Sequence, residues 1–140
     1  MAFAERDQIL TDLKAISDVK ERFSYLIKKG KEFGDLPEEK KTEDFRIKGC
    51  NSQLWLVPEF KDGKIFFEVD SDAAIPKGIA AVLVAAYNGL TPKEALELDP
   101  SFLAEGGIEQ HLSMNRRSGL SNICKQIKYY AMAFLAMSQK

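Results

Sequence analysis

The sequence predicts an α+β fold in which a small antiparallel sheet of about three strands packs against N-terminal, central and C-terminal helices. Apolar residues recur at helical spacing in residues 3–30, 75–90 and 118–137. Two strand-like runs, residues 52–60 and 64–69, flank an Asp-Gly pair of the kind that forms tight hairpins. Because a hairpin alone is marginally stable in water, we expect the helices to cover one of its faces.

Residues 3–30 are expected to form two consecutive helices. Asp18 and Glu21 have the spacing of a capping box, which marks the start of the second helix. Gly30 follows two lysines and is a suitable residue to end that helix. The polar segment at residues 31–44 then indicates a solvated loop or a short helical turn.

The predicted sheet comes next in the chain. Residues 45–47 alternate in polarity and predict a short edge strand, which would be the third strand. Residues 52–60 and 64–69 pair with each other across the Asp-Gly turn. Because Pro58 cannot donate a backbone hydrogen bond, we expect it at a sheet edge, at a bulge, or with its missing N–H facing solvent.

The central helix follows the sheet. The run Asp70-Ser71-Asp72 offers N-cap side chains for this helix, and Gly89 marks its end. The run Thr91-Pro92-Lys93-Glu94 combines an N-cap, a proline in the first turn and a capping-box glutamate, so it predicts a further short helix. Residues 99–115 are expected to be a loop with a helical turn near residues 108–112.

Composition limits the function classes. The chain has 140 residues and is most simply a single domain covering residues 1–140. Its 20 Lys plus Arg nearly balance 21 Asp plus Glu without a basic stripe, which argues against a nucleic-acid partner. The acidic N-terminal stretch does not resemble a secretory signal, and no apolar run approaches the roughly 20 residues that span a bilayer. Two cysteines without an export signal indicate reduced thiols and a cytoplasmic protein.

Cys50 is the candidate reactive residue. It stands between Gly49 and Asn51, which both favour turns, just before the first long strand. A buried cysteine normally shares a face with apolar neighbours, so these polar surroundings favour an accessible, reactive thiol over core packing. Lys48 would favour the thiolate if its ammonium group lies near the sulfur. Cys124 lies in the apolar stripe of the last predicted helix, which favours core packing.

A metal site, a Cys–His pair and an anion-binding arginine have less support from the residues than a reactive Cys50. His111 is the single histidine and no C-x-x-C pair is present, so a zinc site would need Cys50, Cys124 and His111 to converge with a carboxylate. A Cys–His pair stays open because such residues need only meet in space, although a lone histidine is more often structural. Arg116 and Arg117 are expected to be solvated by default. They precede the last helix, where they oppose its dipole, and this slightly raises the chance that one is kept for a specific anionic partner.

Three stretches of the chain match recognisable sequence blocks in order and spacing. The first block is Gly49-Cys50-Asn51-Ser52-Gln53-Leu54-Trp55, similar to G-C-x-S-x-[VL]-W. The second block is Asp70-Ser71-Asp72-Ala73-Ala74-Ile75-Pro76-Lys77-Gly78, similar to D-S-D-A-x-I-x-K-G. The third block runs from His111 to Leu120 and resembles H-L-[ST]-P-x-R-x-x-G-L, with Met114 in place of the proline. Together they resemble the blocks of the SufE family, the sulfur acceptors that work with cysteine desulfurases in iron–sulfur cluster assembly, and the likeness covers roughly residues 18–135.

The resemblance implies a sulfur carrier rather than an enzyme acting alone. A pyridoxal-phosphate cysteine desulfurase, of the SufS or CsdA kind, would transfer sulfur to the residue that matches the family's loop cysteine, Cys50. Cys50 would hold it as a persulfide and pass it to an iron–sulfur scaffold protein, and the chain would stimulate the desulfurase. Pyridoxal phosphate would belong to that partner, and no cofactor or metal is expected here. The implied fold is an α+β sandwich similar to SufE and IscU.

The resemblance also implies supporting residues. Arg116 matches the arginine of the third block and is expected to brace the cysteine loop or to meet the partner. Asp72, Gln53 and His111 are carried over as further loop supports or partner contacts. The same blocks occur in the CsdE-type relatives, so the desulfurase served stays open. The alternative function is an IscU-type scaffold or metal-binding module, which is disfavoured because it needs several clustered cysteines.

Overall fold

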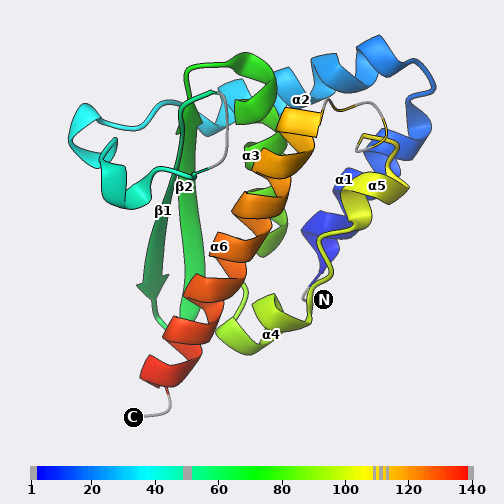
Figure 1. Cartoon of the computed structure of the whole chain (residues 1–140). Coiled ribbons are helices and arrows are strands. Elements are labelled where there is room, and N and C mark those ends of the chain that lie inside the picture. Colours follow the sequence, from blue (N-terminus) through cyan, green and yellow to red (C-terminus); the bar gives the residue numbers. More distant parts are fainter. Residues whose placement is uncertain (1–2, 49–51, 109, 111, 113, 139–140) are drawn as a thin grey trace.

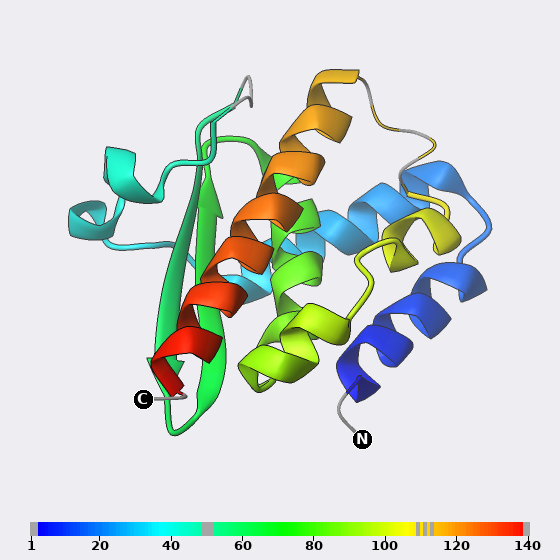
Figure 2. The same cartoon turned by 60° about the horizontal axis from the view of Figure 1, so that its bottom comes forward.

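A hairpin of two antiparallel strands, β1 (Leu54–Lys61) and β2 (Lys64–Ser71), runs along one side of the molecule (Figure 1). Helices α3 (Ala74–Tyr87) and α6 (Met114–Ser138) lie on one face of the hairpin, and the segment at residues 34–48 lies on the other face (Figures 1 and 2). The predicted combination of a small antiparallel sheet with covering helices is confirmed. This computed structural model describes residues 3–48, 52–108, 110, 112 and 114–138, apart from the side chain of Asn115.

The hairpin turn has the predicted residues. Asp62 and Gly63 have φ angles of 54° and 77°, the two positive values of a type I′ turn. Pro58 fits into β1 because it pairs with Phe67, whose N–H donates to Asn88 Oδ1 (2.7 Å) rather than to β1. In an antiparallel pair without backbone hydrogen bonds between its two residues, both N–H groups point away from the partner strand. The N–H that Pro58 lacks would therefore point to the outer edge of the sheet, which is one of the three expected positions.

The predicted third strand at residues 45–47 is wrong. The chain makes a 3₁₀ turn at Glu43–Phe45 and then meets β1 through a single bridge between Arg46 and Trp55. Because the 3₁₀ turn leaves the extended conformation just before this bridge, too little chain lies alongside β1 to build a ladder. In the described part of the chain the sheet therefore has two strands.

Both faces of β1 are covered at its first residues. Leu54 and Leu56 belong to the main core, which is shared with α3 and α6. Trp55 points to the opposite face and packs with Leu36 and Phe45 in a smaller cluster. Alternating side chains on a strand point to opposite faces, so burial of consecutive residues requires a layer on each side. The end of β1 closest in sequence to Cys50 is thus fixed firmly.

Helices α1 (Ala4–Ala15) and α2 (Val19–Phe33) are the two helices predicted in residues 3–30. The side chain of Asp18 caps α2, as expected. The prediction that Gly30 ends this helix is wrong, because α2 continues to Phe33 and is followed by Gly34 with a φ of 78°. Left-handed backbone geometry therefore occurs at the later glycine.

Gly30 instead lies where α2 crosses α3. A Cβ atom on Gly30 would lie 3.1 Å from the backbone nitrogen of Gly78, and a Cβ on Gly78 would overlap the carbonyl of Leu26. Only residues without a Cβ allow two helix backbones to approach this closely. The pair of glycines therefore sets the contact between α2 and α3.

The predicted N-cap of the central helix is also wrong. Ala73 occupies the N-cap position of α3, and it has no side-chain hydrogen bond to the helix. Asp70 and Asp72 accept hydrogen bonds from other segments instead. The reason is competition, because backbone N–H groups of residues 36 and 53 come within reach of these carboxylates in the folded chain.

Downstream of α3 the local signals hold. Gly89, with a φ of 85°, follows the helix near its predicted end. Helix α4 (Pro92–Glu97) begins with the predicted capping box. The Thr91 hydroxyl accepts from the Glu94 N–H (3.2 Å), and the Glu94 carboxylate accepts from the Thr91 N–H (2.9 Å).

The loop before the last helix differs from the prediction. It contains a short helix, α5 (Phe102–Glu105), earlier than the turn expected near residues 108–112, which falls partly outside the described residues. Helix α6 begins at Met114 rather than near Ser118, so the two arginines lie within its first turn. Among the described residues, none of the helices has the length and apolar character needed to cross a membrane.

Candidate functional site

The structure describes the chain on both sides of the candidate nucleophile, up to Lys48 and again from Ser52. Cys50 and His111 themselves lie outside the described residues, so their roles stay predictions. The site is therefore built from the residues that hold the two ends of the segment at residues 49–51, which we name the cysteine turn for the conformation that its sequence predicts.

The chain that leaves the turn is anchored by Asp72. Its Oδ1 accepts from the Gln53 N–H at 3.0 Å, and the Gln53 carbonyl accepts from the Asp72 N–H at 3.2 Å. The Ser71 hydroxyl donates to the same carbonyl at 2.6 Å. Two of the predicted site residues, Gln53 and Asp72, are thus brought together, and Gln53 takes part through its backbone. These bonds join the end of the turn to the junction between β2 and α3.

The chain that enters the turn is held at two points. The Ile47 N–H donates to the Leu54 carbonyl at 2.8 Å, which ties this segment to the start of β1. The Asn122 side chain of α6 donates from Nδ2 to the Lys48 carbonyl at 2.7 Å. Sequence reasoning missed Asn122 because it looks like an ordinary polar residue beside the apolar stripe of α6, and no local pattern points to Lys48.

A buried carboxylate lies beside these anchors. Asp70, only 3% exposed, accepts from the N–H groups of Leu36 (3.0 Å) and Ser71 (2.8 Å). It also pairs with Lys41 (3.3 Å) and Lys77 (3.2 Å). Burial by itself raises the pKa of Asp70, but the hydrogen bonds from these groups outweigh it and hold the pKa below its usual value. The carboxylate therefore stays ionised and fastens the segment at residues 34–48 to the hairpin.

The second sequence block now has a physical explanation. Asp70 and Lys77 form its buried ion pair, and Gly78 makes the close helix crossing. Lys77 also pairs with the exposed Asp35 at 2.7 Å. Burial lowers the pKa of Lys77, whereas its bonds to Asp35 and Asp70 raise it, and the net direction is upward. Of the block's residues, Ser71 and Asp72 bond to Gln53, where the chain leaves the turn.

The two arginines lie on the first turn of α6, and both are exposed. Arg117 donates from Nη2 to the Gln110 carbonyl at 3.3 Å, which ties the start of α6 to the preceding loop. Arg116 is thus on a different element from Gln53 and Asp72. Its exposed position is compatible with contact to a partner.

A groove of about 550 Å³ runs between the segment at residues 43–48 and α6. Lys48 and Asn122 line it together with Lys125 and Gln126. The groove therefore extends directly to the segment that enters the turn at Cys50.

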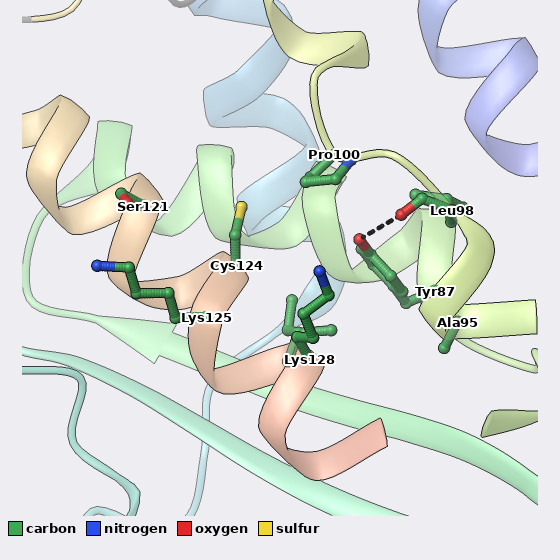
Figure 3. Close-up of a pocket in the computed structure, with 9 residues that line it drawn as sticks. Tyr87, Ala95, Leu98, Pro100, Ser121, Cys124, Lys125 and Lys128 are labelled. Atoms are coloured by element: carbon green, nitrogen blue, oxygen red, sulfur yellow. Dashed lines mark hydrogen bonds between the residues drawn. The ribbon is translucent and has the colours of Figure 1, made fainter. Parts of the chain in front are cut away.

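Cys124 lies away from this region, in a separate pocket of about 200 Å³ between α4 and α6 (Figure 3). It is partly buried and packs against the main core, as predicted from its spacing. In the same pocket the Tyr87 hydroxyl donates to the Leu98 carbonyl at 3.4 Å. Burial, with smaller contributions from Cys124 and Asp99, raises the pKa of Tyr87 well above its usual value.

Metal ligands do not gather in the part of the chain that the structure describes. Within it, no group of three or more His, Cys, Asp or Glu side chains is arranged to hold an ion. The convergence of Cys50, Cys124 and His111 that a zinc site would need involves two residues outside the described ranges.

The chain is similar to a known protein family and to several known proteins. The SufE family model, described as an Fe-S metabolism associated domain, matches residues 7–131. An uncharacterized SufE-like protein of a Synechocystis species is 37% identical over 118 residues, which cover 84% of this chain and 74% of the relative. An uncharacterized SufE-like protein of Rhizobium etli is 35% identical over 130 residues, 89% of this chain and 88% of the relative.

A third relative and one solved structure agree. An uncharacterized SufE-like protein of Rhizobium meliloti is 32% identical over 127 residues, covering 87% of this chain and 91% of the relative. The fold is similar to the solution structure of a hypothetical protein from Thermus thermophilus, with a TM-score of 0.80 and 20% identity. That match covers 97% of this chain and 99% of the other, so it supports the fold across nearly the whole length.

Proposed function

Because the chain belongs to the SufE family and so has a role in Fe-S metabolism, we propose that it is a cytoplasmic sulfur acceptor and carrier. Cys50 takes persulfide sulfur from a cysteine desulfurase and passes it to an iron–sulfur cluster scaffold protein. The chain thereby stimulates the desulfurase and is not an enzyme by itself. Pyridoxal phosphate belongs to the desulfurase, which releases the sulfur from free cysteine.

The transfer is a thiol–persulfide exchange. The Cys50 thiolate attacks the terminal sulfur of the desulfurase persulfide, the sulfur–sulfur bond of that persulfide breaks, and the desulfurase cysteine leaves as a thiolate. One sulfur–sulfur bond forms as another breaks, so no external oxidant or reductant is needed. The persulfide proton stays on the transferred sulfur or exchanges with water.

Support comes chiefly from the match of the SufE family model to residues 7–131. The surroundings of Cys50 in the chain add support, because hydrogen bonds from other elements hold Lys48 on one side of the cysteine and Gln53 on the other. Anchored ends suit a thiol that must enter a partner's cleft in a fixed direction, because small misplacements of reacting atoms slow a reaction strongly.

We assign supporting roles within the same proposal. Asp72 and Gln53 hold the chain that leaves the cysteine turn, since their backbone and side-chain bonds join β1 to the β2–α3 junction. Arg116 contacts the desulfurase from the exposed first turn of α6. His111 is a further partner contact or loop support.

The test is mass spectrometry of the intact protein after incubation with a cysteine desulfurase of the SufS or CsdA kind and cysteine. Wild type and Cys124→Ser should each gain one sulfur that a reductant removes, whereas Cys50→Ser should gain none. Equal labelling of Cys50→Ser and wild type would refute the assignment of Cys50.

A further inference from the structure

The cysteine turn is connected to α6 by one side chain. Among the described residues, Asn122 makes the single side-chain hydrogen bond between α6 and the segment that enters the turn, from its Nδ2 to the Lys48 carbonyl (2.7 Å). The other bonds of the described residues at the two ends of the turn join Ile47 to Leu54, and Ser71 and Asp72 to Gln53. They lie within the sheet and its junction with α3. Within the described part of the chain, Asn122 is therefore the side chain that links α6 by a hydrogen bond to the segment entering the turn.

Packing does not replace this hydrogen bond. The groove of about 550 Å³ separates α6 from the segment at residues 43–48, and both Asn122 and Lys48 are at its border. Ile47 is buried against the core, but Lys48 is exposed. The chain therefore leaves its well-packed region one residue before the carbonyl that Asn122 binds.

We propose that Asn122 is a positioning residue for sulfur transfer: by holding the Lys48 carbonyl against α6, it fixes the direction in which the chain enters the turn at Cys50. This inference rests on the proposed function of Cys50. Helix α6 also carries Arg116 at its exposed start, so the Asn122 bond ties the chain that enters the turn and the proposed partner contact into one frame. A thiolate attacking a persulfide needs an aligned approach, which such a frame supplies.

The experiment compares two variants that make the same chemical change. Asn122→Asp keeps the size of the side chain but replaces the donor with a carboxylate oxygen that repels the Lys48 carbonyl. Gln126→Glu makes the same change of amide to carboxylate one turn later, on the same groove, where the structure shows no hydrogen bond of Gln126 to another described residue. Any effect of added negative charge in the groove is therefore shared by both variants.

Two readouts separate positioning from folding and from binding. The rate of sulfur transfer to Cys50 is measured in single turnovers over a range of desulfurase concentrations. The alkylation rate of Cys50 by iodoacetamide is measured without the desulfurase. Losing one neutral hydrogen bond corresponds to roughly a fivefold effect. We expect Asn122→Asp to lower the maximal transfer rate about fivefold relative to Gln126→Glu. Its half-saturating concentration should match that of the control, and its alkylation rate should change. Its thermal midpoint should fall by only a few degrees, about the effect of one lost hydrogen bond, which leaves the protein folded at the assay temperature.

Each result decides between the possibilities. Equal maximal rates for the two variants, with normal uptake by wild type, would overturn the role of Asn122 alone. An effect of Asn122→Asp confined to the half-saturating concentration would overturn it in favour of a binding contact. A slower transfer explained by partial unfolding of the variant at the assay temperature would overturn it in favour of a role in stability. Wild-type protein that accepts no sulfur would overturn the proposed function, and this inference with it.

Discussion

Replacement of Asp70 by asparagine tests whether the buried carboxylate fastens the segment at residues 34–48 to the hairpin. One of its oxygens accepts from the Leu36 N–H and pairs with Lys41, and the other accepts from the Ser71 N–H and pairs with Lys77. An asparagine of the same size keeps one acceptor. Its amide NH₂ must face a backbone N–H and an ammonium group, whichever way the amide is turned.

The expected magnitude follows from these contacts. Leaving one buried backbone donor unpaired costs about 1–3 kcal/mol, and removing one partner of a buried ion pair costs about 3–5 kcal/mol. The Lys41 and Lys77 side chains keep 21% and 13% exposure, so water can partly hydrate their ammonium groups in the variant. We therefore expect the free energy of unfolding to fall by about 3 kcal/mol, the lower end of the ion-pair range.

The pH dependence has a definite sign. The pKa of Asp70 is lowered in the folded protein, so the folded state binds the proton less tightly than the unfolded state does. The ionised Asp70 carboxylate therefore stabilises the folded state fully above its pKa in the unfolded chain, about 4. This stabilisation is lost as the pH falls through the lower pKa of Asp70 in the folded protein. The asparagine variant has no such group to protonate. The difference in stability between wild type and Asp70→Asn should therefore shrink below about pH 4.

Urea unfolding at pH 7 and near pH 3 measures both effects. With a slope of about 2 kcal/mol per molar, the midpoint should move down by about 1.5 M at pH 7. Asp35→Asn is the matched control, because Asp35 also pairs with Lys77, at 2.7 Å, but its side chain is 83% exposed. An exposed pair contributes about 0–1 kcal/mol. Midpoints that coincide for the two variants, or a gap that does not change with pH, would refute the reasoning.

Three further predictions concern the helix crossing, the second cysteine and metal content. Gly78→Ala should lose about 1–3 kcal/mol because its Cβ would overlap the Leu26 carbonyl, although alanine favours helix formation; unchanged or higher stability in urea unfolding would contradict the close crossing. Cys124→Ala should keep sulfur acceptance and lose about 1 kcal/mol, since the side chain is only partly buried; loss of transfer at full stability would indicate a second relay thiol. Elemental analysis of the purified protein should find no stoichiometric zinc or iron, and a near one-to-one metal content that disappears in Cys50→Ser would favour the scaffold alternative.

The sequence predicts correctly the roles of residues whose interaction partners are close to them in the chain. Asp62 and Gly63 form the predicted turn because the conformations open to adjacent residues decide it. Thr91 and Glu94 form the predicted capping box because both partners lie within one helical turn. The apolar periodicity of the last helix likewise predicted the inward position of Cys124, which packs partly buried against the core.

The tertiary structure decided the roles that depend on distant segments. Gly30 matched a helix end, and only the approach of α3 made it a crossing residue opposite Gly78. Asp70 matched an N-cap, but in the folded chain the Leu36 N–H and two lysines bind its carboxylate. Asn122 carried no signal at all, because its partner is the backbone carbonyl of Lys48, and every residue has such a carbonyl. Sequence patterns record what a side chain prefers, whereas the path of the chain decides which groups come within hydrogen-bond distance.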